Sequence, residues 1–234
     1  MKKENVLFGI TGLLAGLIIG FMFANSVNQT AATSVPAAMS AMQANSNLPP
    51  GHPDIGSAQA KTITPEMQAA IDRAKQQPGD LDAQLKAAEA YYQIEKFDEA
   101  IAYLTAANQI NPQDREILVH LGNANFDAER FTEAEKWYMA ALAKKSDDVN
   151  VRTDLGLTFV FREPANYDRA IEEFNRSLAE DPGHIQTLQN LTVAYTKKGD
   201  ATKASATLAK LEEHDAKNAA ISKLREDIKK IQSK

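Results

Sequence analysis

FDEAIAYLTAANQINP (97–112), FTEAEKWYMAALAKKS (131–146) and YDRAIEEFNRSLAEDP (167–182) are three versions of one pattern, and ATKASATLAKLEEHDA (201–216) is a weaker fourth. The first three begin with an aromatic residue, and all four place an alanine three residues later and continue with apolar residues at helical spacing. The aligned alanines are Ala100, Ala134, Ala170 and Ala204, separated by 34, 36 and 34 residues. A period of this length indicates a stack of identical supersecondary units.

A helical segment precedes each copy: AAEAYY (87–92), LGNANF (121–126), LGLTFV (155–160) and LTVAYT (191–196). Its centre carries a small residue, Ala88, Gly122 or Gly156, where two helices of one unit would cross, and Thr192 departs from this rule. Residue types and spacing together resemble the tetratricopeptide repeat (TPR), a helix–turn–helix unit of 34 residues. The resemblance implies an all-α, TPR-type α-solenoid with about four repeats, at about 81–114, 115–148, 149–184 and 185–218.

Flanking helices are expected on both sides of the repeats, within a TPR domain spanning 64–234. Thr64–Pro65 is typical of a helix N-terminus, and the helix it begins should run to about Gln77. Ile221, Leu224, Ile228 and Ile231 form one apolar stripe, which predicts a capping helix at about 217–233. Within repeat three, Pro164 should end the first helix in a longer turn, because proline cannot occupy the middle of a helix.

The N-terminal segment 1–24 is predicted to be a transmembrane anchor. Val6–Ala24 is a run of 19 residues without charge, which spans about 28 Å as a helix. Lys2 and Lys3 precede it, and no further Lys or Arg occurs before Lys61. This asymmetry predicts a single-pass protein of the bacterial inner (cytoplasmic) membrane, with its N-terminus in the cytoplasm and the repeats in the periplasm. A cleavable signal is the alternative, since Ala24 and Ser26 have the spacing of a cleavage site.

Four glycines, Gly9, Gly12, Gly16 and Gly20, fall on one face of this predicted helix. A glycine face allows a second membrane helix to approach closely, which favours association with another copy or with a membrane partner. The alternative is the general abundance of glycine in membrane helices. Residues 25–63 are rich in Ala, Ser, Asn, Gln and Pro and are predicted to be a disordered linker.

Composition excludes several classes of function. The chain has 26 Lys and Arg against 31 Asp and Glu, a net charge of −5, so it lacks the basic character expected of a nucleic-acid binder. It has no cysteine and four histidines, none in a metal-ligand motif. No phosphate-binding loop or nucleophile elbow occurs either. The sequence therefore predicts no enzyme, no metal and no cofactor.

The resemblance to the TPR family implies that a concave groove, lined by the first helix of each repeat, binds a protein or peptide. In the family's register the groove residues of repeats one to three are Leu85, Glu89, Tyr92, Val119, Asn123, Phe126, Leu157, Val160 and Phe161, and repeat four adds Gln189, Val193 and Lys197. These apolar side chains would be exposed in the free protein, as is usual for a binding site. Only Asn123 fits the lysine, arginine and asparagine set with which one TPR subclass clamps a carboxylate, so we expect an apolar or mildly basic partner segment.

Anchor, linker and repeats together resemble membrane-anchored bacterial TPR proteins, including the subunit that presents apocytochrome during c-type cytochrome maturation. The sequence thus predicts a membrane-anchored scaffold for assembling an envelope complex. The alternative is a structural homo-oligomer organised by the glycine face.

Overall fold

The computed structural model describes residues 62–233, and these form helices without any β-strand. The helices are α2 (Pro65–Gln76), α3 (Leu81–Gln93), α4 (Phe97–Ile110), α5 (Arg115–Asp127), α6 (Phe131–Lys144), α7 (Val149–Phe161), α8 (Tyr167–Glu180), α9 (Ile185–Lys198), α10 (Ala201–His214) and α11 (Ile221–Gln232). The predicted transmembrane segment and nearly all of the predicted linker lie outside the described residues. None of the helices in 62–233 is long and apolar enough to cross a membrane.

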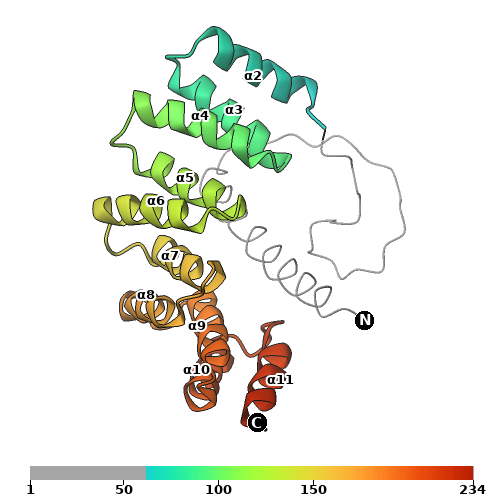
Figure 1. Cartoon of the computed structure of the whole chain (residues 1–234), viewed down its shortest axis with the longest axis vertical. Coiled ribbons are helices and arrows are strands. Elements are labelled where there is room, and N and C mark those ends of the chain that lie inside the picture. The colour runs from blue at the N-terminus through green and yellow to red at the C-terminus, as the bar shows by residue number, and fades with distance from the viewer. Residues whose placement is uncertain (1–61, 234) are drawn as a thin grey trace, which may run out of the picture. The chain divides into compact units, whose positions relative to one another are not determined.

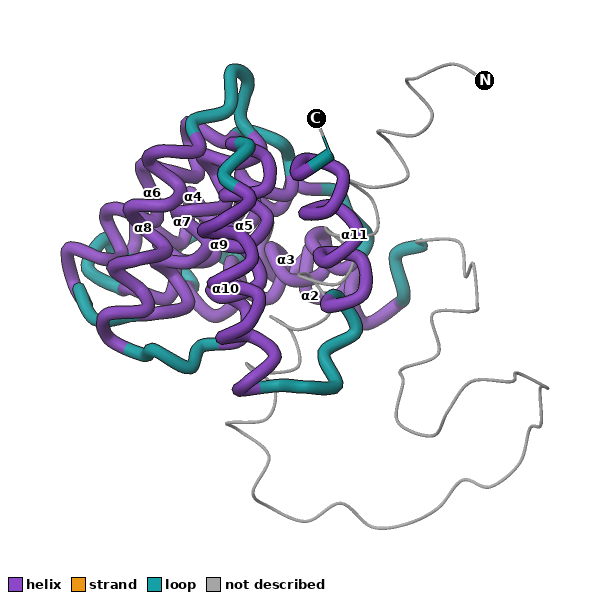
Figure 2. Tube along the Cα trace, turned by 90° about the horizontal axis from the view of Figure 1, so that it is seen from below, coloured by secondary structure: helices purple, strands orange, loops and turns teal. Residues whose placement is uncertain are grey.

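The helices stack in chain order as antiparallel pairs (Figure 1). α3 pairs with α4, α5 with α6, α7 with α8 and α9 with α10, and each pair packs on the next. α2 packs on α3, and α11 packs on α10 and α9. Figure 2 looks along the stack and shows the second helices α4, α6 and α8 on one side, with the first helices α3 and α5 towards the other. The first helices α3 and α5 therefore lie on a common side of the stack.

Glycine fixes the crossing inside the second and third pairs. Gly122 of α5 lies under the ring of Tyr138 of α6, and Gly156 of α7 lies under the ring of Phe174 of α8. Both rings are fully buried. A Cβ built on Gly156 would stand 2.4 Å from Phe174 Cε1, which is closer than two carbon atoms can approach. The aromatic ring therefore occupies the space that a side chain at the crossing would need.

Aspartate caps the N-terminus of four of the eight repeat helices. The side chain of Asp148 accepts a hydrogen bond from Val151 N at 3.0 Å, and Asp80 accepts one from Ala83 N at 3.2 Å. Asp114 and Asp200 cap α5 and α10 in the same way. These bonds satisfy backbone N–H groups that have no partner within the helix. Thr64 caps α2 ahead of Pro65, as the sequence predicts.

The aligned alanines Ala134 and Ala170 are 36 residues apart instead of 34. The two extra residues of the third repeat lie in the turn between α7 and α8. α7 ends at Phe161 ahead of Pro164, as predicted, and Asn166 then caps α8 by accepting from Arg169 N at 3.1 Å. The guanidinium groups of Arg162 and Arg169 lie 5.5 Å and 5.3 Å from the ring centroid of Phe159. These cation–π contacts tie the longer turn to the core of the pair.

Amphipathic helices close both ends of the stack. Ile71 and Ala74 of α2 are buried against α3, and Ile221, Leu224 and Ile228 of α11 are buried against α9 and α10. The stripe predicted at the C-terminus therefore lies on a packed face, although α11 begins at Ile221, later than the predicted start. Terminal repeats need such cover because each has one unpaired apolar face.

Replacing Gly156 with valine should destabilise the fold. The added side chain would overlap the Phe174 ring, which is buried and has no free space to move into. We expect the free energy of unfolding to fall by about 1–3 kcal/mol, the usual cost of overpacking a core. Urea denaturation followed by circular dichroism measures the change.

Gly79→Val is the matched control, because nothing lies within 4 Å of a Cβ at Gly79. Its effect should stay within about 0.5 kcal/mol. Equal losses in the two variants would show that the crossing does not require glycine.

Candidate functional site

The residues predicted to line the groove all lie on the first helices of the four pairs. Leu85, Glu89 and Tyr92 are on α3, Val119, Asn123 and Phe126 on α5, Leu157, Val160 and Phe161 on α7, and Gln189, Val193 and Lys197 on α9. We call the surface of α3, α5, α7 and α9 that carries them the inner face. Glu89 and Lys197 are exposed, and the others are half-buried except Leu157. The expectation that Leu157 is exposed is wrong, since only 4% of it is accessible where α7 packs among its neighbours.

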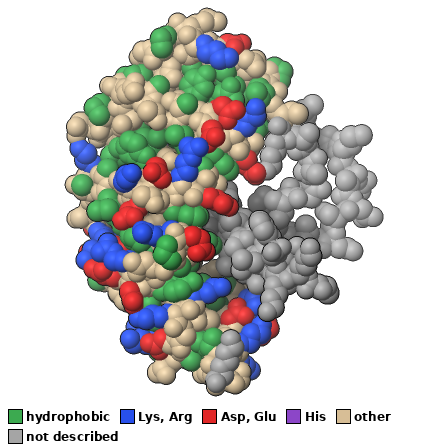
Figure 3. Space-filling view, in the orientation of Figure 1, with side chains coloured by type: hydrophobic (Ala, Val, Ile, Leu, Met, Phe, Trp, Pro, Cys, Tyr) green, Lys and Arg blue, Asp and Glu red, His purple; other side chains and the backbone are tan. Residues whose placement is uncertain are grey.

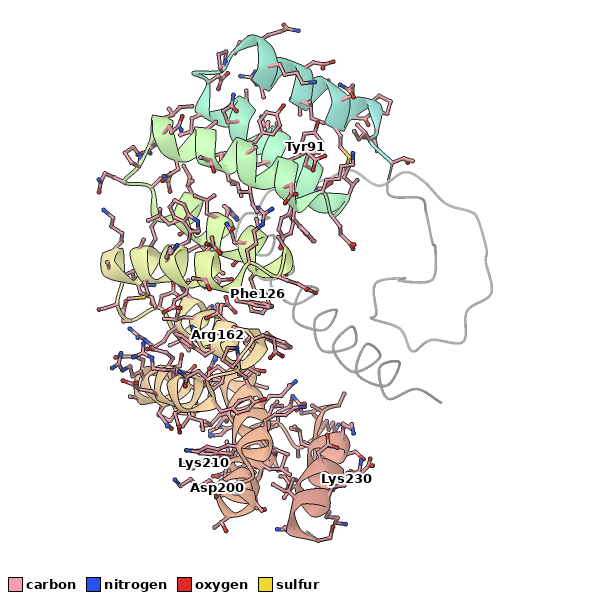
Figure 4. All side chains as sticks on the ribbon, in the orientation of Figure 1. Tyr91, Phe126, Arg162, Asp200, Lys210 and Lys230 are labelled. Carbon is pink, nitrogen blue, oxygen red and sulfur yellow. The ribbon has the colours of Figure 1, made fainter. Side chains whose placement is uncertain are left out.

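Aromatic residues at the C-terminal ends of the first helices contact one another between repeats. Phe126 lies 5.8 Å from Phe161, and both lie against Phe131, at 5.3 Å and 6.2 Å between ring centroids. Figure 4 shows Phe126 and Arg162 at the same edge of the stack. Tyr92 makes a similar edge-to-face contact with Phe97, at 5.5 Å. The aromatic residues of the inner face thus join consecutive repeats as well as offering half-exposed surface.

Hydrogen bonds connect the inner face to the core of repeat two. The Tyr138 hydroxyl donates to Asn123 Oδ1 at 2.9 Å, so the ring that covers Gly122 also orients this amide. Tyr92 Oη donates to Asp127 Oδ2 at the end of α5. Burial raises the pKa of Asp127 to about 6, although the Tyr92 hydrogen bond opposes this.

Asp154 is a buried acid that the sequence reasoning missed. Only 5% of it is exposed, and its carboxylate accepts no hydrogen bond from any residue in 62–233. Burial, and then the charges of Asp148 and Asp127, raise its pKa to about 8. One signal could have found it, because Asp154 precedes Leu157 by three residues and Phe161 by seven. At 3.6 residues per turn all three share one side of α7.

Two amide groups on α9 also lack partners. Gln186 Nε2 and Asn190 Nδ2 are buried without a hydrogen bond. Asn190 precedes Val193 by three residues, so it repeats on α9 the register of Asp154 on α7. The Thr153 and Thr187 hydroxyls meet at 2.6 Å and hold the two helices side by side. Unsatisfied polar groups are uncommon in buried positions, so this part of the inner face is unusual.

The described residues offer no obvious alternative chemistry. No group of three or more His, Asp or Glu side chains within 62–233 could hold a metal ion. His184 Nδ1 is bonded to Thr187 Oγ1 at 2.6 Å at the start of α9, and His120 is exposed on α5. Positive and negative side chains are intermingled on the face seen in Figure 3, with no broad basic area on it.

Comparison with known protein families decides what the repeats are. Two family profiles, both described as tetratricopeptide repeat, match the chain, one over residues 162–228 and the other over 65–114 and 85–149. The chain belongs to the tetratricopeptide-repeat family. The predicted all-α, TPR-type solenoid is therefore confirmed for the described residues.

Solved structures agree with this assignment. A crystal structure of MamA is 25% identical, covers 64% of this chain and 87% of its own, and superposes with a TM-score of 0.59. YrrB, described as a TPR protein with an unusual peptide-binding site, is 18% identical, with 72% and 94% covered and a TM-score of 0.59. A TPR protein from Parabacteroides merdae is 17% identical, with 65% and 60% covered and the same TM-score of 0.59. A search of curated protein sequences found no match.

Asp154 should make the stability of this TPR domain depend on pH. Its pKa rises from an ordinary 3.8 to about 8 on folding, so the unfolded chain loses this proton first as the pH increases. The Asp154 contribution to the free energy of unfolding should therefore decline between about pH 4 and pH 8 and be lowest above that range. Asp154→Asn removes this decline.

Urea denaturation at pH 5 and pH 8.5 measures the effect. The stability of Asp154→Asn relative to the unmodified protein should increase by about 1 kcal/mol or more between the two pH values. Asp147→Asn removes the same charge from an exposed turn and should show no such increase. A constant difference for Asp154→Asn would contradict the raised pKa.

Proposed function

We propose that this TPR protein is a scaffold that holds an apolar or mildly basic segment of a partner protein on its inner face. The observation that carries the proposal is the composition of that face. Half-buried aliphatic and aromatic side chains such as Val119, Val160 and Phe126 occur on the same set of first helices as acidic groups such as Glu89 and Asp127. Apolar surface of this kind, bordered by polar residues, is typical of a binding site.

The family and one of its structures support this reading. Stacked helix pairs present an extended surface that suits a linear segment. YrrB is described as having a peptide-binding site, and it shares the fold with this chain. Catalysis is not part of the proposal, because the inner face holds no nucleophile paired with a base.

We further propose that residues 1–24 anchor the scaffold in the bacterial inner membrane as a single pass, with the TPR domain in the periplasm. The uncharged run Val6–Ala24 and the lysines that precede it support this topology. The scaffold would then assemble an envelope complex, for which the c-type cytochrome maturation system offers a similar plan. The alternative is a homo-oligomer formed through Gly9, Gly12, Gly16 and Gly20, with partner binding secondary.

One substitution on the inner face and one in the predicted membrane helix distinguish the scaffold from the homo-oligomer. Glu89→Lys reverses an exposed charge and should reduce partner recovery at least about fivefold, because it repels a basic segment. Gly16→Leu should leave recovery unchanged if the scaffold reading is right. Crosslinking in membranes followed by mass spectrometry measures both.

Met139→Ala is the control for the Glu89→Lys substitution. Met139 is 51% exposed on the second helix α6, away from the inner face, so its loss should not change recovery. Loss of function with Gly16→Leu and none with Glu89→Lys would favour the oligomer instead.

Reporter fusions test the topology. A phosphatase fused after residue 60 should be active, since that enzyme works only outside the cytoplasm, and the full chain should sediment with membranes. Fusion to the first four residues, ahead of the apolar run, should give an inactive reporter. A soluble mature chain that begins near Val27 would identify a cleaved signal and refute the anchor.

A further inference from the structure

The third repeat contains two buried acids that the fold treats in opposite ways. Glu173 of α8 is 2% exposed and lies within ion-pair distance of three arginines, Arg152 at 2.9 Å, Arg169 at 3.4 Å and Arg176 at 3.5 Å. Asp154 of α7 is 5% exposed, and no cationic side chain contributes to its pKa. Where the fold needs a buried carboxylate for its own structure, it supplies guanidinium groups. Asp154 receives none.

An unpaired carboxylate in this position destabilises the free protein. Removing an acid from water costs several kcal/mol unless a cation or hydrogen bonds replace the solvent. The negative charges of Asp148 and Asp127 further disfavour the ionised form of Asp154. Arg115 already pairs with Asp148, and the Tyr92 hydroxyl already donates to Asp127. Neither of these two donors is therefore available to Asp154.

The surroundings of Asp154 fit one kind of ligand group. Val160 and Phe161 follow it along α7 and are half-buried, so they provide accessible apolar surface on the same helix as the acid. Lysine and arginine have a long aliphatic stem and a cationic end, so the stem can lie on apolar side chains while the charge reaches a recessed carboxylate. A backbone N–H cannot reach so far from its own chain.

We propose that Asp154 is the acceptor for one lysine or arginine side chain of the bound partner segment. This rests on the proposed function, since it names the charged contact made by a segment on the inner face. The pairing also explains why the chain keeps a destabilising group, because the unfavourable burial is relieved only when the partner supplies a cation.

A peptide selection tests the proposal with the full chain in detergent. A phage-displayed library of random twelve-residue peptides is the probe, and the selected peptides are synthesised and measured by fluorescence polarisation at pH 8.5. We expect enrichment of Lys or Arg over the unselected library. Replacing that residue with norleucine, or Asp154 with asparagine, should each weaken binding at least about tenfold. The two changes together should weaken it little further, since they remove one shared contact.

Controls distinguish this contact from general electrostatics and from loss of the fold. Asp147→Asn removes one negative charge from the exposed turn just before α7 and should change affinity less than about twofold. Binding to the unmodified chain should also tighten from pH 6.5 to pH 8.5 as Asp154 ionises. Asp154→Asn should flatten that trend, leaving the contribution of Asp127, while the other groups coupled to Asp154, Tyr92 and Tyr138, stay protonated in this range. Thermal unfolding verifies that each variant is folded.

The outcomes separate the inference from the proposed function. Peptides that lose affinity with Glu89→Lys or Phe126→Ala but not with Asp154→Asn would overturn the role of Asp154 and leave the scaffold intact. Peptides without enriched Lys or Arg would have the same meaning. Recovery of no peptide at all would count against both.

Discussion

The close crossing of two helices over a glycine is the contact on which the rest of the TPR domain depends. In repeats two and three an aromatic ring of the second helix packs directly on Gly122 or Gly156, and the two helices can approach because the first helix carries no side chain at this point. This close packing joins the two helices of repeats two and three. Tyr138 links this packing to the surface, because its hydroxyl also binds Asn123 on the inner face.

The third repeat contains two buried acids, Glu173 with several arginine partners and Asp154 without a cationic partner among the described residues. Glu173 is surrounded by arginines and joins α7 to α8, so its burial contributes to one defined arrangement. Asp154, on the adjacent helix, has a pKa that burial raises, and it has no counter-ion in the described part of the chain. Proteins retain destabilising groups of this kind mainly at sites that bind ligands or catalyse reactions, because selection on function offsets the loss of stability. The inner face around α7 therefore combines apolar contact surface with a carboxylate whose charge is not balanced by the fold.

Local features of the sequence predicted most of the fold correctly. Thr64–Pro65 begins α2, Pro164 lies in the turn after α7, and Phe97, Phe131 and Tyr167 are the first residues of second helices. Each of these depends on backbone geometry or on contacts within one repeat, which sequence spacing captures. The predicted inner-face residues lie on the expected helices, but their exposure was harder to predict. Leu157 is buried and Phe126 packs on Phe161, because both depend on how one repeat sits against the next.

The sequence by itself determined the repeat length, the helix–turn–helix unit and the residues at the crossings, since these follow from periodicity and from side-chain size. Only the tertiary structure decided which charged groups have partners. Arg152, Arg169 and Arg176 converge on Glu173 from two helices, while no Lys or Arg within residues 62–233 forms an ion pair with Asp154. Sequence spacing cannot distinguish these two acids, because the energy of a buried charge depends on groups that are distant in the chain and close in space.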